Sequence, residues 1–501
     1  MILPVFSLPS PHGIGTLGQA AYDFIDFLRD AGQSWWQMLP LGPTGYGDSP
    51  YQSLSAYAGN PYFIDLELLA QEGLLTREEI AAQPWGAEPN RVDYSALYAH
   101  RLALLQKAAR RGLIRGSQAV DAFLQENRHW LPDYALYMAV KEHFGHLPWT
   151  QWPEEGIRLR RPEALAHYRQ LLAEEIETHQ YIQFLFFRQW DALCRYAHSQ
   201  GIGIIGDMPI YVSMDSADVW TEPQFFQLDS CGHPTEVAGV PPDYFSENGQ
   251  LWGNPLYDWA AMEKDGYGWW LSRLGHALTT YDAVRIDHFR AFASYWAVDA
   301  QAETAKVGQW LPGPGMKLFG KVFEVYPNAP IIAEDLGVFG EDVVQLLADT
   351  GFPGMKVVQF GFDPNGDSSH MPHNAEKNSI NYVGTHDNNT LLGWLWEAGE
   401  AERRFALDYA GFTGDNWGDG GYQSPACRKI IETVWRSASN VVIIALQDMC
   451  GFGSDARMNT PGVPEKNWRF RTTEDTIANI DGAYFRRINS LFRRTYPVFE
   501  K

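Results

Sequence analysis

Short runs of apolar residues recur along the chain, and a segment with helical periodicity follows or precedes most of them. Continuous runs rich in valine and isoleucine are typical of strands that are buried on both faces, as they are in a parallel sheet. The pattern predicts eight such strands, at residues 36–41, 61–65, 202–207, 283–287, 330–334, 355–360, 381–387 and 441–446.

Amphipathic helical segments lie beside these predicted strands. The clearest are residues 22–28, 184–196 and 341–347, where apolar positions recur at intervals of three and four. Eight strands that alternate with helices predict an α/β protein with a (β/α)8 TIM-barrel fold rather than an open sheet.

The predicted strands are unevenly spaced, which indicates two large insertions into the barrel. Residues 66–180, between the second and third strands, are mostly helical in pattern and predict a helical subdomain. Residues 212–280, between the third and fourth strands, are rich in Pro, Gly, Trp and Tyr and predict a loop-rich insertion along the ligand groove. Residues 1–65, 181–211 and 281–501 are assigned to the barrel itself.

The composition is that of a globular protein with a large core. Hydrophobic residues make up 45% of the chain and charged residues 20%, so disorder is not expected. The formal charge is 39 − 61 = −22, which argues against nucleic acid or an anionic membrane surface as a partner. The sequence has no apolar stretch long enough to span a bilayer, no recognisable secretory leader and no CxxC pair among its four cysteines. We therefore expect a cytoplasmic protein without a zinc ribbon or a disulfide framework.

Aromatic residues are unusually frequent, at 14% of the chain, with 19 Trp and 24 Tyr. They can form a core of large side chains, or they can line a groove with flat rings that stack on a ligand. Composition alone leaves both explanations open.

With the short run at 61–65 set aside, four of the remaining predicted strands end in an acidic residue: Asp207, Asp287, Glu334 and Asp387. The carboxyl ends of barrel strands converge on one pocket, so these side chains are expected to meet there. A single acid at such a position can simply cap the next helix or pair with an arginine. Four together indicate chemistry that needs carboxylates.

The neighbours of these acids suggest different tasks for them. Arg285 and Asp287 are two positions apart on a strand, so both side chains point the same way and the guanidinium is expected to lower the pKa of Asp287, as suits a nucleophile. Glu334 directly follows an apolar strand, and desolvation there is expected to raise the pKa of its carboxyl, which suits a proton donor. His386 beside Asp387 offers hydrogen bonds to hydroxyl groups. Paired carboxylates with opposite tuning, beside aromatic rings, are typical of glycosidic-bond chemistry.

Several segments around these residues are similar to those of a known family. The chain resembles the 4-α-glucanotransferases of the amylomaltase (disproportionating enzyme) type, relatives of the α-amylase superfamily. The resemblance runs from the first predicted strand to about Trp468, and one departure is Lys466, where the family more often has Gly. It is carried by LGPTGYGDSPYQ at 41–52, GDMPI at 206–210, GVPPDYFSENGQLWGNP at 239–255, RIDHFR at 285–290, AEDLG at 333–337, GTHDN at 384–388 and RMNTP at 457–461.

The resemblance implies a role for each matching residue. Asp287 corresponds to the nucleophile, Glu334 to the general acid/base and Asp387 to the acid that holds substrate hydroxyls. Residues 239–255 correspond to a lid over the groove, and no cofactor, calcium or other metal is implied. The positions that match glucan contacts are Asp207, Arg285 and His386 around the scissile bond, Trp252 in the lid, Ser49, Tyr51 and Asn459 further along, and Tyr46 at a glucan site further out.

The expected activity is therefore transfer of α-1,4-glucan segments, from maltooligosaccharides or amylose-like chains, to the 4-hydroxyl of an acceptor glucan or glucose. Asp287 attacks C1, Glu334 protonates the leaving chain, and the acceptor then takes the glucosyl group with retention. A retaining α-1,4-glucan hydrolase is the alternative, since water can intercept the same intermediate and the residue chemistry does not separate the two. A catalytically silent glucan-binding protein is disfavoured because all three central acids are present. A metal-dependent hydrolase is disfavoured because the chain lacks HxH and HExxH spacings.

Overall fold

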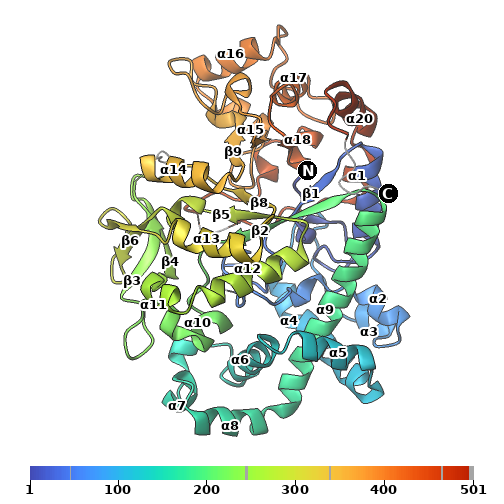
Figure 1. The fold of residues 1–501 in the computed structure, drawn as a ribbon. Coiled ribbons are helices and arrows are strands. Elements are labelled where there is room, and N and C mark those ends of the chain that lie inside the picture. Colours follow the sequence, from blue (N-terminus) through green and yellow to red (C-terminus); the bar gives the residue numbers. More distant parts are fainter. Residues whose placement is uncertain (46, 243–245, 338–339, 464–465, 496–501) are drawn as a thin grey trace.

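Parallel strands form a barrel at the centre of the computed structural model, which describes residues 1–45, 47–242, 246–337, 340–463 and 466–495 (Figure 1). The strands belong to two sheets, ordered β1-β2-β5-β8 and β9-β10-β11, and each paired neighbour is parallel. Their bounds are β1 Trp35–Gln37, β2 Gly203–Pro209, β5 Ala283–Asp287, β8 Ile331–Ala333, β9 Gly354–Val357, β10 Ser379–Tyr382 and β11 Val441–Ile443.

The two sheets are joined at both edges, which closes the barrel. The N-terminal segment lies between β1 and β11, where Ile2 forms parallel bridges to Gln37 and Ala445. At the other edge the Ala333 amide in β8 donates a hydrogen bond to the Pro353 carbonyl just before β9 (3.0 Å). The predicted (β/α)8 barrel is therefore confirmed.

One predicted strand of the barrel was wrong, and one segment that takes part in the barrel was not predicted. Residues 61–65 contain a 3-10 helix, Pro61–Phe63, instead of a strand. Pro61 occupies the first helical position and the Asn60 side chain accepts the Tyr62 amide (3.0 Å), a combination that favours a helical turn. The segment that was not predicted is the one around Ile2, which bridges β1 and β11 without forming a strand of its own. The long helical segment follows β1 and precedes β2 in the chain.

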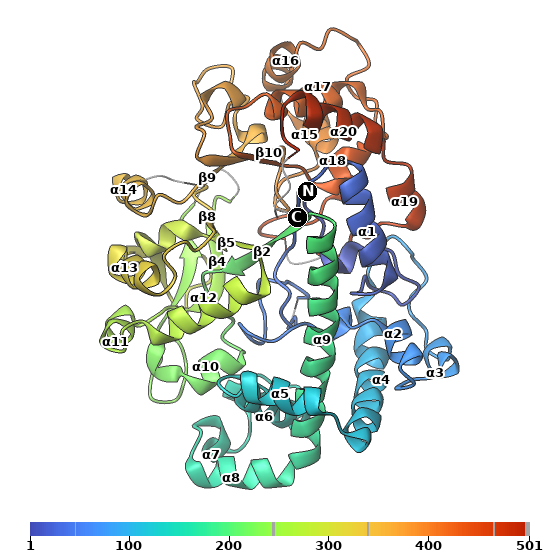
Figure 2. The same cartoon turned by 45° about the vertical axis from the view of Figure 1, so that its right-hand side comes forward.

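This helical segment packs against one long helix. Helix α9, Ala173–Ser199, runs from the end of the molecule that carries α7 and α8 to the barrel and leads into β2, and helices α4 and α6 pack along it (Figures 1 and 2). None of the helices in the described ranges has the length and apolar character needed to cross a membrane. The other helices up to β2 are α1 Gln19–Asp30, α2 Leu66–Gln71, α3 Arg77–Ala81, α4 Tyr94–Arg115, α5 Gln118–Glu126, α6 Leu131–His143, α7 Glu155–Arg158 and α8 Pro162–Leu171.

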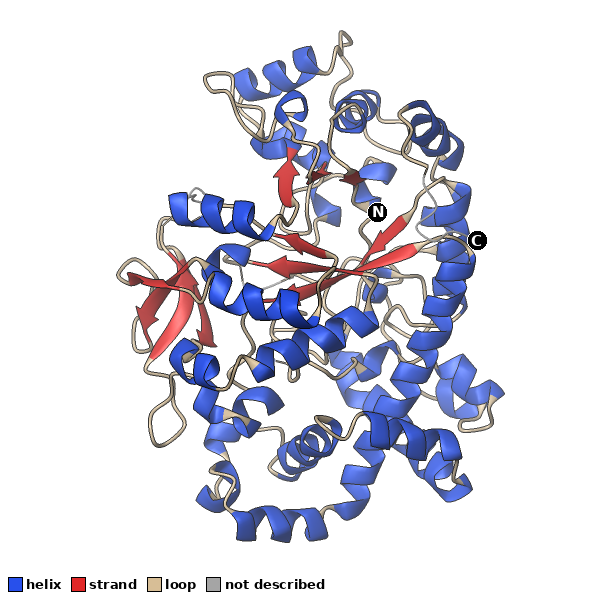
Figure 3. Ribbon diagram, viewed as in Figure 1, coloured by secondary structure: helices blue, strands red, loops and turns tan. Residues whose placement is uncertain are grey.

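The segment predicted to be loop-rich contains helices and strands. Its strands β3 and β4 join two later ones in a separate antiparallel sheet, ordered β4-β3-β6-β7, at one side of the barrel (Figure 3). Gly249 permits the close approach of the chain to β3 where β4 begins, since its φ is +67° and an added Cβ would lie 2.4 Å from the Val240 carbonyl oxygen. The bounds are β3 Glu236–Val240, β4 Gln250–Pro255, β6 Ser294–Asp299 and β7 Gln309–Pro312, with helices α10 Ala217–Thr221, α11 Trp259–Lys264 and α12 Gly268–Thr280.

The remaining helices complete the outer layer of the barrel. Helices α13 and α14 follow β5 and β8, and helices α15 to α17 lie together between β10 and β11 (Figure 2). Their bounds are α13 Met316–Val325, α14 Glu341–Thr350, α15 Leu391–Glu397, α16 Glu400–Tyr409, α17 Pro425–Trp435, α18 Leu446–Cys450, α19 Glu474–Ala478 and α20 Gly482–Leu491.

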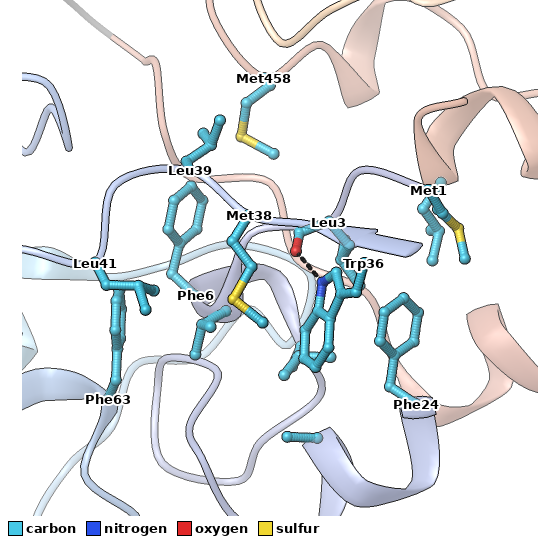
Figure 4. Packing of buried hydrophobic residues seen from close by; sticks show 14 of the residues in the cluster. Met1, Leu3, Phe6, Phe24, Trp36, Met38, Leu39, Leu41, Phe63 and Met458 are labelled. Atoms are coloured by element: carbon cyan, nitrogen blue, oxygen red, sulfur yellow. Dashed lines mark hydrogen bonds between the residues drawn. The ribbon is translucent and has the colours of Figure 1, made fainter. Parts of the chain in front are cut away.

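A large apolar cluster anchors the N-terminal segment in the barrel (Figure 4). The fully buried Trp36 of β1 donates its indole N–H to the Leu3 carbonyl (2.8 Å), and Phe24 of α1 packs edge-on against its ring at 4.9 Å. Burial of these large side chains stabilises the packing of the N-terminal segment against the short strand β1.

Candidate active site

The four acids expected at strand ends lie on the carboxyl side of the barrel. Asp207 lies in β2 and Asp287 ends β5, while Glu334 directly follows β8 and Asp387 lies in the loop after β10. Because the strands are parallel, these positions share one rim.

Arg285 connects two of the acids through a buried ion-pair cluster. Its Nη1 lies 2.8 and 2.7 Å from the carboxylate oxygens of Asp207, and its Nη2 lies 3.0 Å from Oδ1 of Asp287. The Arg285 and Asp207 side chains are 3% and 0% exposed, whereas Asp287 is 27% exposed. Asp287 is therefore the carboxylate of this cluster that a ligand can reach.

The pKa of Asp287 is higher than the sequence suggested. Desolvation at the base of the site raises it, and the nearby Asp207 and Asp387 carboxylates raise it further, although Arg285 opposes the shift. Arg285 lowers the pKa of Asp287, as expected, but burial of the carboxyl is the larger effect and the net shift is upward.

Glu334 is held by the main chain of two neighbouring segments. Its Oε2 accepts the His288 amide (2.7 Å) and its Oε1 accepts the Leu336 amide (2.8 Å). Burial raises the pKa of Glu334, and the neighbouring Asp287 carboxyl adds to the shift, while Arg285 and the two amides oppose it. The carboxyl is thus suited to hold a proton near neutral pH, as the apolar strand before it indicated.

Asp387 has the opposite electrostatic surroundings. Its Oδ1 accepts a hydrogen bond from Asn459 Nδ2 (2.6 Å), and His386 Nε2 lies 3.3 Å from its Oδ2. Burial alone would raise the pKa of Asp387, but His386 and Asn459 outweigh it and lower the pKa to about 2. Its side chain is 45% exposed, so an ionised carboxylate faces the opening of the site.

Tyr51 connects the loop at 41–52 to the barrel. Its hydroxyl donates to Asp207 Oδ2 (2.8 Å), and its ring stacks on the His386 imidazole at 5.1 Å with an interplanar angle of 20°. Ser49 shapes the turn before it, since its Oγ accepts the Tyr51 amide (3.3 Å). Tyr46, the other residue expected from this loop, lies outside the described residues.

The β3–β4 hairpin brings Trp252 to the site through His288. The two rings meet edge to face with centroids 4.7 Å apart, and the His288 amide is the donor to Glu334. On the same strand, Asn254 accepts a hydrogen bond from Gln52 (3.1 Å). The segment expected as a lid, residues 239–255, includes the end of β3 and all of β4, and β4 is joined to the loop that carries Tyr51; residues 243–245 lie outside the described ranges.

Two residues that contact the acids had no site role in the sequence prediction. Arg457 Nη2 donates to the Asp387 carbonyl (2.7 Å), and His288 positions Glu334 through its main chain, with φ at +56°. The sequence feature that could have indicated a site role for them is that Arg457 belongs to the family segment RMNTP and His288 to RIDHFR. Lys466 also has a left-handed φ, +71°, at the position where glycine was the expected residue.

The arrangement provides two carboxyls raised in pKa to different extents beside a third that stays ionised. One can attack an electrophilic carbon while the other donates a proton, and the third can accept hydroxyl groups. Within the described ranges, no three His, Cys, Asp or Glu side chains are grouped as metal ligands would be.

Comparison with known proteins gives consistent matches along the chain. A family model described as 4-alpha-glucanotransferase matches residues 3–476. The 4-alpha-glucanotransferase of Streptococcus pneumoniae serotype 4 is 45% identical over 496 residues, covering 99% of this chain and 97% of the relative. That of Thermus thermophilus is 46% identical over 499 residues, covering 97% of each. The solved amylomaltase from Streptococcus agalactiae, in complex with acarbose, matches with a TM-score of 0.94 at 41% identity and 98% coverage of both chains.

Proposed function

The chain belongs to the 4-α-glucanotransferase family, whose activity is glycosyl transfer on α-1,4-glucans, and from this premise we propose how its own residues carry out the reaction. Asp287 is the nucleophile and Glu334 the general acid/base. Two sets of contacts support this assignment. Arg285 forms an ion pair with the partly exposed carboxylate of Asp287, and the buried carboxyl of Glu334 accepts hydrogen bonds from main-chain amides.

In the first step Asp287 attacks C1 of a glucosyl unit and the bond from C1 to the glycosidic oxygen breaks. Glu334 gives its proton to that oxygen, so the departing chain leaves with a free 4-hydroxyl. A covalent glucosyl ester of Asp287 remains, and Glu334 is now ionised.

In the second step the 4-hydroxyl of an acceptor glucan attacks the same C1. Glu334 takes the proton of that hydroxyl, the ester bond to Asp287 breaks, and both side chains return to their starting state. Two inversions at C1 retain the α configuration.

The surrounding residues are proposed to bind the sugar at the reacting bond. Asp387, ionised and exposed, accepts hydroxyl hydrogen bonds with His386 and Asn459 beside it. Asp207 and Tyr51 form the polar base of the same site. Ser49 and Tyr46 are proposed as contacts for sugars further along the chain, on the family resemblance.

Trp252 is proposed to cover the position of the acceptor. Its ring contacts His288, next to both Asp287 and Glu334, and a flat ring there can stack on the incoming sugar while it excludes water. That arrangement favours transfer over hydrolysis of the intermediate. The acarbose bound by the Streptococcus agalactiae amylomaltase supports a glucan-like ligand for the equivalent region of this chain. We propose maltooligosaccharides and amylose-like chains as the donors.

We also propose a cytoplasmic location, which the four free cysteines support. Cys427 and Cys450 are buried thiols, and burial raises the pKa of each. Localisation of a tagged chain in the source cells would test it.

The assignment is tested by replacing the two acids and supplying a donor with a good leaving group. With maltotriose, Asp287→Asn and Glu334→Gln are each expected to lose at least about a thousandfold in kcat, because the barrier to either step rises. With an α-maltosyl fluoride donor, whose fluoride leaves without a proton, Glu334→Gln should recover formation of the covalent maltosyl-enzyme and Asp287→Asn should not.

Product analysis and a folding check complete the experiment. The unaltered enzyme should convert maltotriose into glucose and a ladder of longer chains. Both variants should keep the unaltered circular-dichroism spectrum. Equal recovery of both variants with the fluoride would show that the two roles are assigned wrongly.

A further inference from the structure

Trp396 is an exposed tryptophan held in one orientation on the surface. It lies in α15, and 48% of its surface is exposed. Its indole N–H donates to the Gly418 carbonyl (3.1 Å), and the far edge of its ring lies over the Gly453 backbone. The ring is therefore fixed on one side while much of it faces solvent.

Close approach, rather than backbone conformation, explains the glycine under this ring. Gly453 has φ −84° and ψ −170°, which any residue can adopt. A Cβ at Gly453, however, would lie 2.3 Å from the Trp396 ring. The Trp396 ring is therefore a flat apolar surface that the backbone holds in place and leaves open on one side, which is the kind of surface on which a sugar ring can stack.

The Trp396 surface is connected to the rim of the active site. Ser454, next to Gly453, donates to Glu397 Oε1 (3.0 Å) and accepts from Asn389 Nδ2 (2.9 Å). Asn389 belongs to the loop that carries Asp387. Trp396 is therefore linked, through Glu397 and Ser454, to the loop that carries Asp387.

Hydrogen-bonding groups around Trp396 favour a ligand with hydroxyl groups. Glu397, Asp419 and Asp455 are exposed in α15 or in the loops that hold the ring. The nearby cation Arg403 is engaged with the Ala398 carbonyl (2.9 Å) and with the Trp417 ring. Carboxylates accept hydrogen bonds from hydroxyls and repel anions, and the ring offers the flat apolar surface on which a sugar can stack.

We propose that Trp396 is a stacking platform for a glucose unit of a long α-glucan, outside the group of residues that hold the reacting bond. The platform increases the affinity for long chains and leaves the chemical steps unchanged. It rests on the α-glucan substrate of the proposed function, but not on the roles given there to Asp287 and Glu334.

The test compares a long and a short donor in Trp396→Ala. With amylose as the donor, kcat/KM is expected to fall about three- to tenfold, the range of a single aromatic stacking contact, while kcat/KM for maltotriose stays within about twofold. Trp396→Phe keeps a ring over Gly453 and should retain most of the amylose activity.

Trp310→Ala is the matched control. Trp310 is 40% exposed, but the Arg290 guanidinium lies 3.9 Å from its ring centroid, in the antiparallel sheet on another side of the barrel. This variant should leave both substrates unchanged.

A binding measurement separates affinity from turnover. In the Asp287→Asn background, adding Trp396→Ala should raise the dissociation constant for amylose by the same factor, as affinity electrophoresis would show. The proposal would be overturned if Trp396→Ala lowered kcat/KM equally for amylose and maltotriose, or lowered it for neither. It would also be overturned if the substitution changed the oligomeric state of the protein and its effect did not depend on the length of the donor. Residual transfer by Asp287→Asn would instead count against the nucleophile assignment alone.

Discussion

Arg285 determines the balance of charge at the centre of the site. It is buried between Asp207 and Asp287, and each of its two Nη atoms pairs with one of these carboxylates. A buried cation with two carboxylates is costly to assemble, and removing it would leave uncompensated charges in the barrel. Its contribution is to keep Asp287 available as an anion although desolvation raises the pKa of that side chain.

At this scale, we expect a bell-shaped dependence of kcat/KM on pH. The first step needs ionised Asp287 and protonated Glu334. Burial raises both pKa values, and Glu334 is shifted further from its usual value. The acidic limb should therefore lie above the ordinary aspartate pKa of about 4, and the alkaline limb well above the ordinary glutamate pKa of about 4.3.

The alkaline limb can be assigned with the fluoride donor. Glu334→Gln carries no titrating proton, so its profile with α-maltosyl fluoride should lose that limb and keep the acidic one. Persistence of the alkaline limb in this variant would mean that another group, such as His386, titrates there.

At the scale of elements, the barrel depends on a segment too short to form a strand of its own. Ile2 bridges β1 and β11, and it is 4% exposed within the apolar group formed by Val357, Tyr382 and Ile443. The catalytic rim is built on the strands that this contact closes, so the segment supports the site from a distance.

We predict that Ile2→Ala lowers the free energy of unfolding by about 2–4 kcal/mol, the usual cost of truncating a buried isoleucine. Urea unfolding followed by tryptophan fluorescence measures it. Ile114→Ala in α4 is the control, because that side chain is 87% exposed and its truncation should cost little. If the two variants lost the same stability, Ile2 would not be part of the closed barrel in solution.

At the scale of the whole molecule, the net charge of −22 suits a neutral substrate. The acids that line the site accept hydroxyl groups, and no charge attraction is needed to bring an uncharged glucan to them. The same excess of negative charge produces repulsion across the molecule.

We therefore expect KM for maltotriose to be almost independent of salt. Raising NaCl from about 10 to about 100 mM shortens the screening length from about 30 to about 10 Å, and KM should change by less than about twofold. Thermal stability should rise over the same range as repulsion is screened. Steady-state kinetics and thermal melts check the two effects, and a steep rise or fall of KM would mean that charge takes part in substrate binding.

Much of this architecture could be predicted from local patterns. Continuous apolar runs indicated the strands that became β1, β2, β5, β8, β9, β10 and β11, and the acids at their ends were expected to meet. The run at 61–65 misled because Asn60 and Pro61 favour a helical turn. The strands β3, β4 and β7 were missed because their short segments include Gly or Pro, and β6, which has neither, was missed as well.

The sequence by itself determined the barrel, the acids at its strand ends and the chemistry that such acids permit, because hydrophobic period and residue type are local properties. The tertiary structure decided what depends on distant neighbours: the closure by Ile2, the raised pKa of Asp287 and the platform at Trp396. Desolvation and packing arise only when separate segments exclude water together, so no local pattern could reveal them.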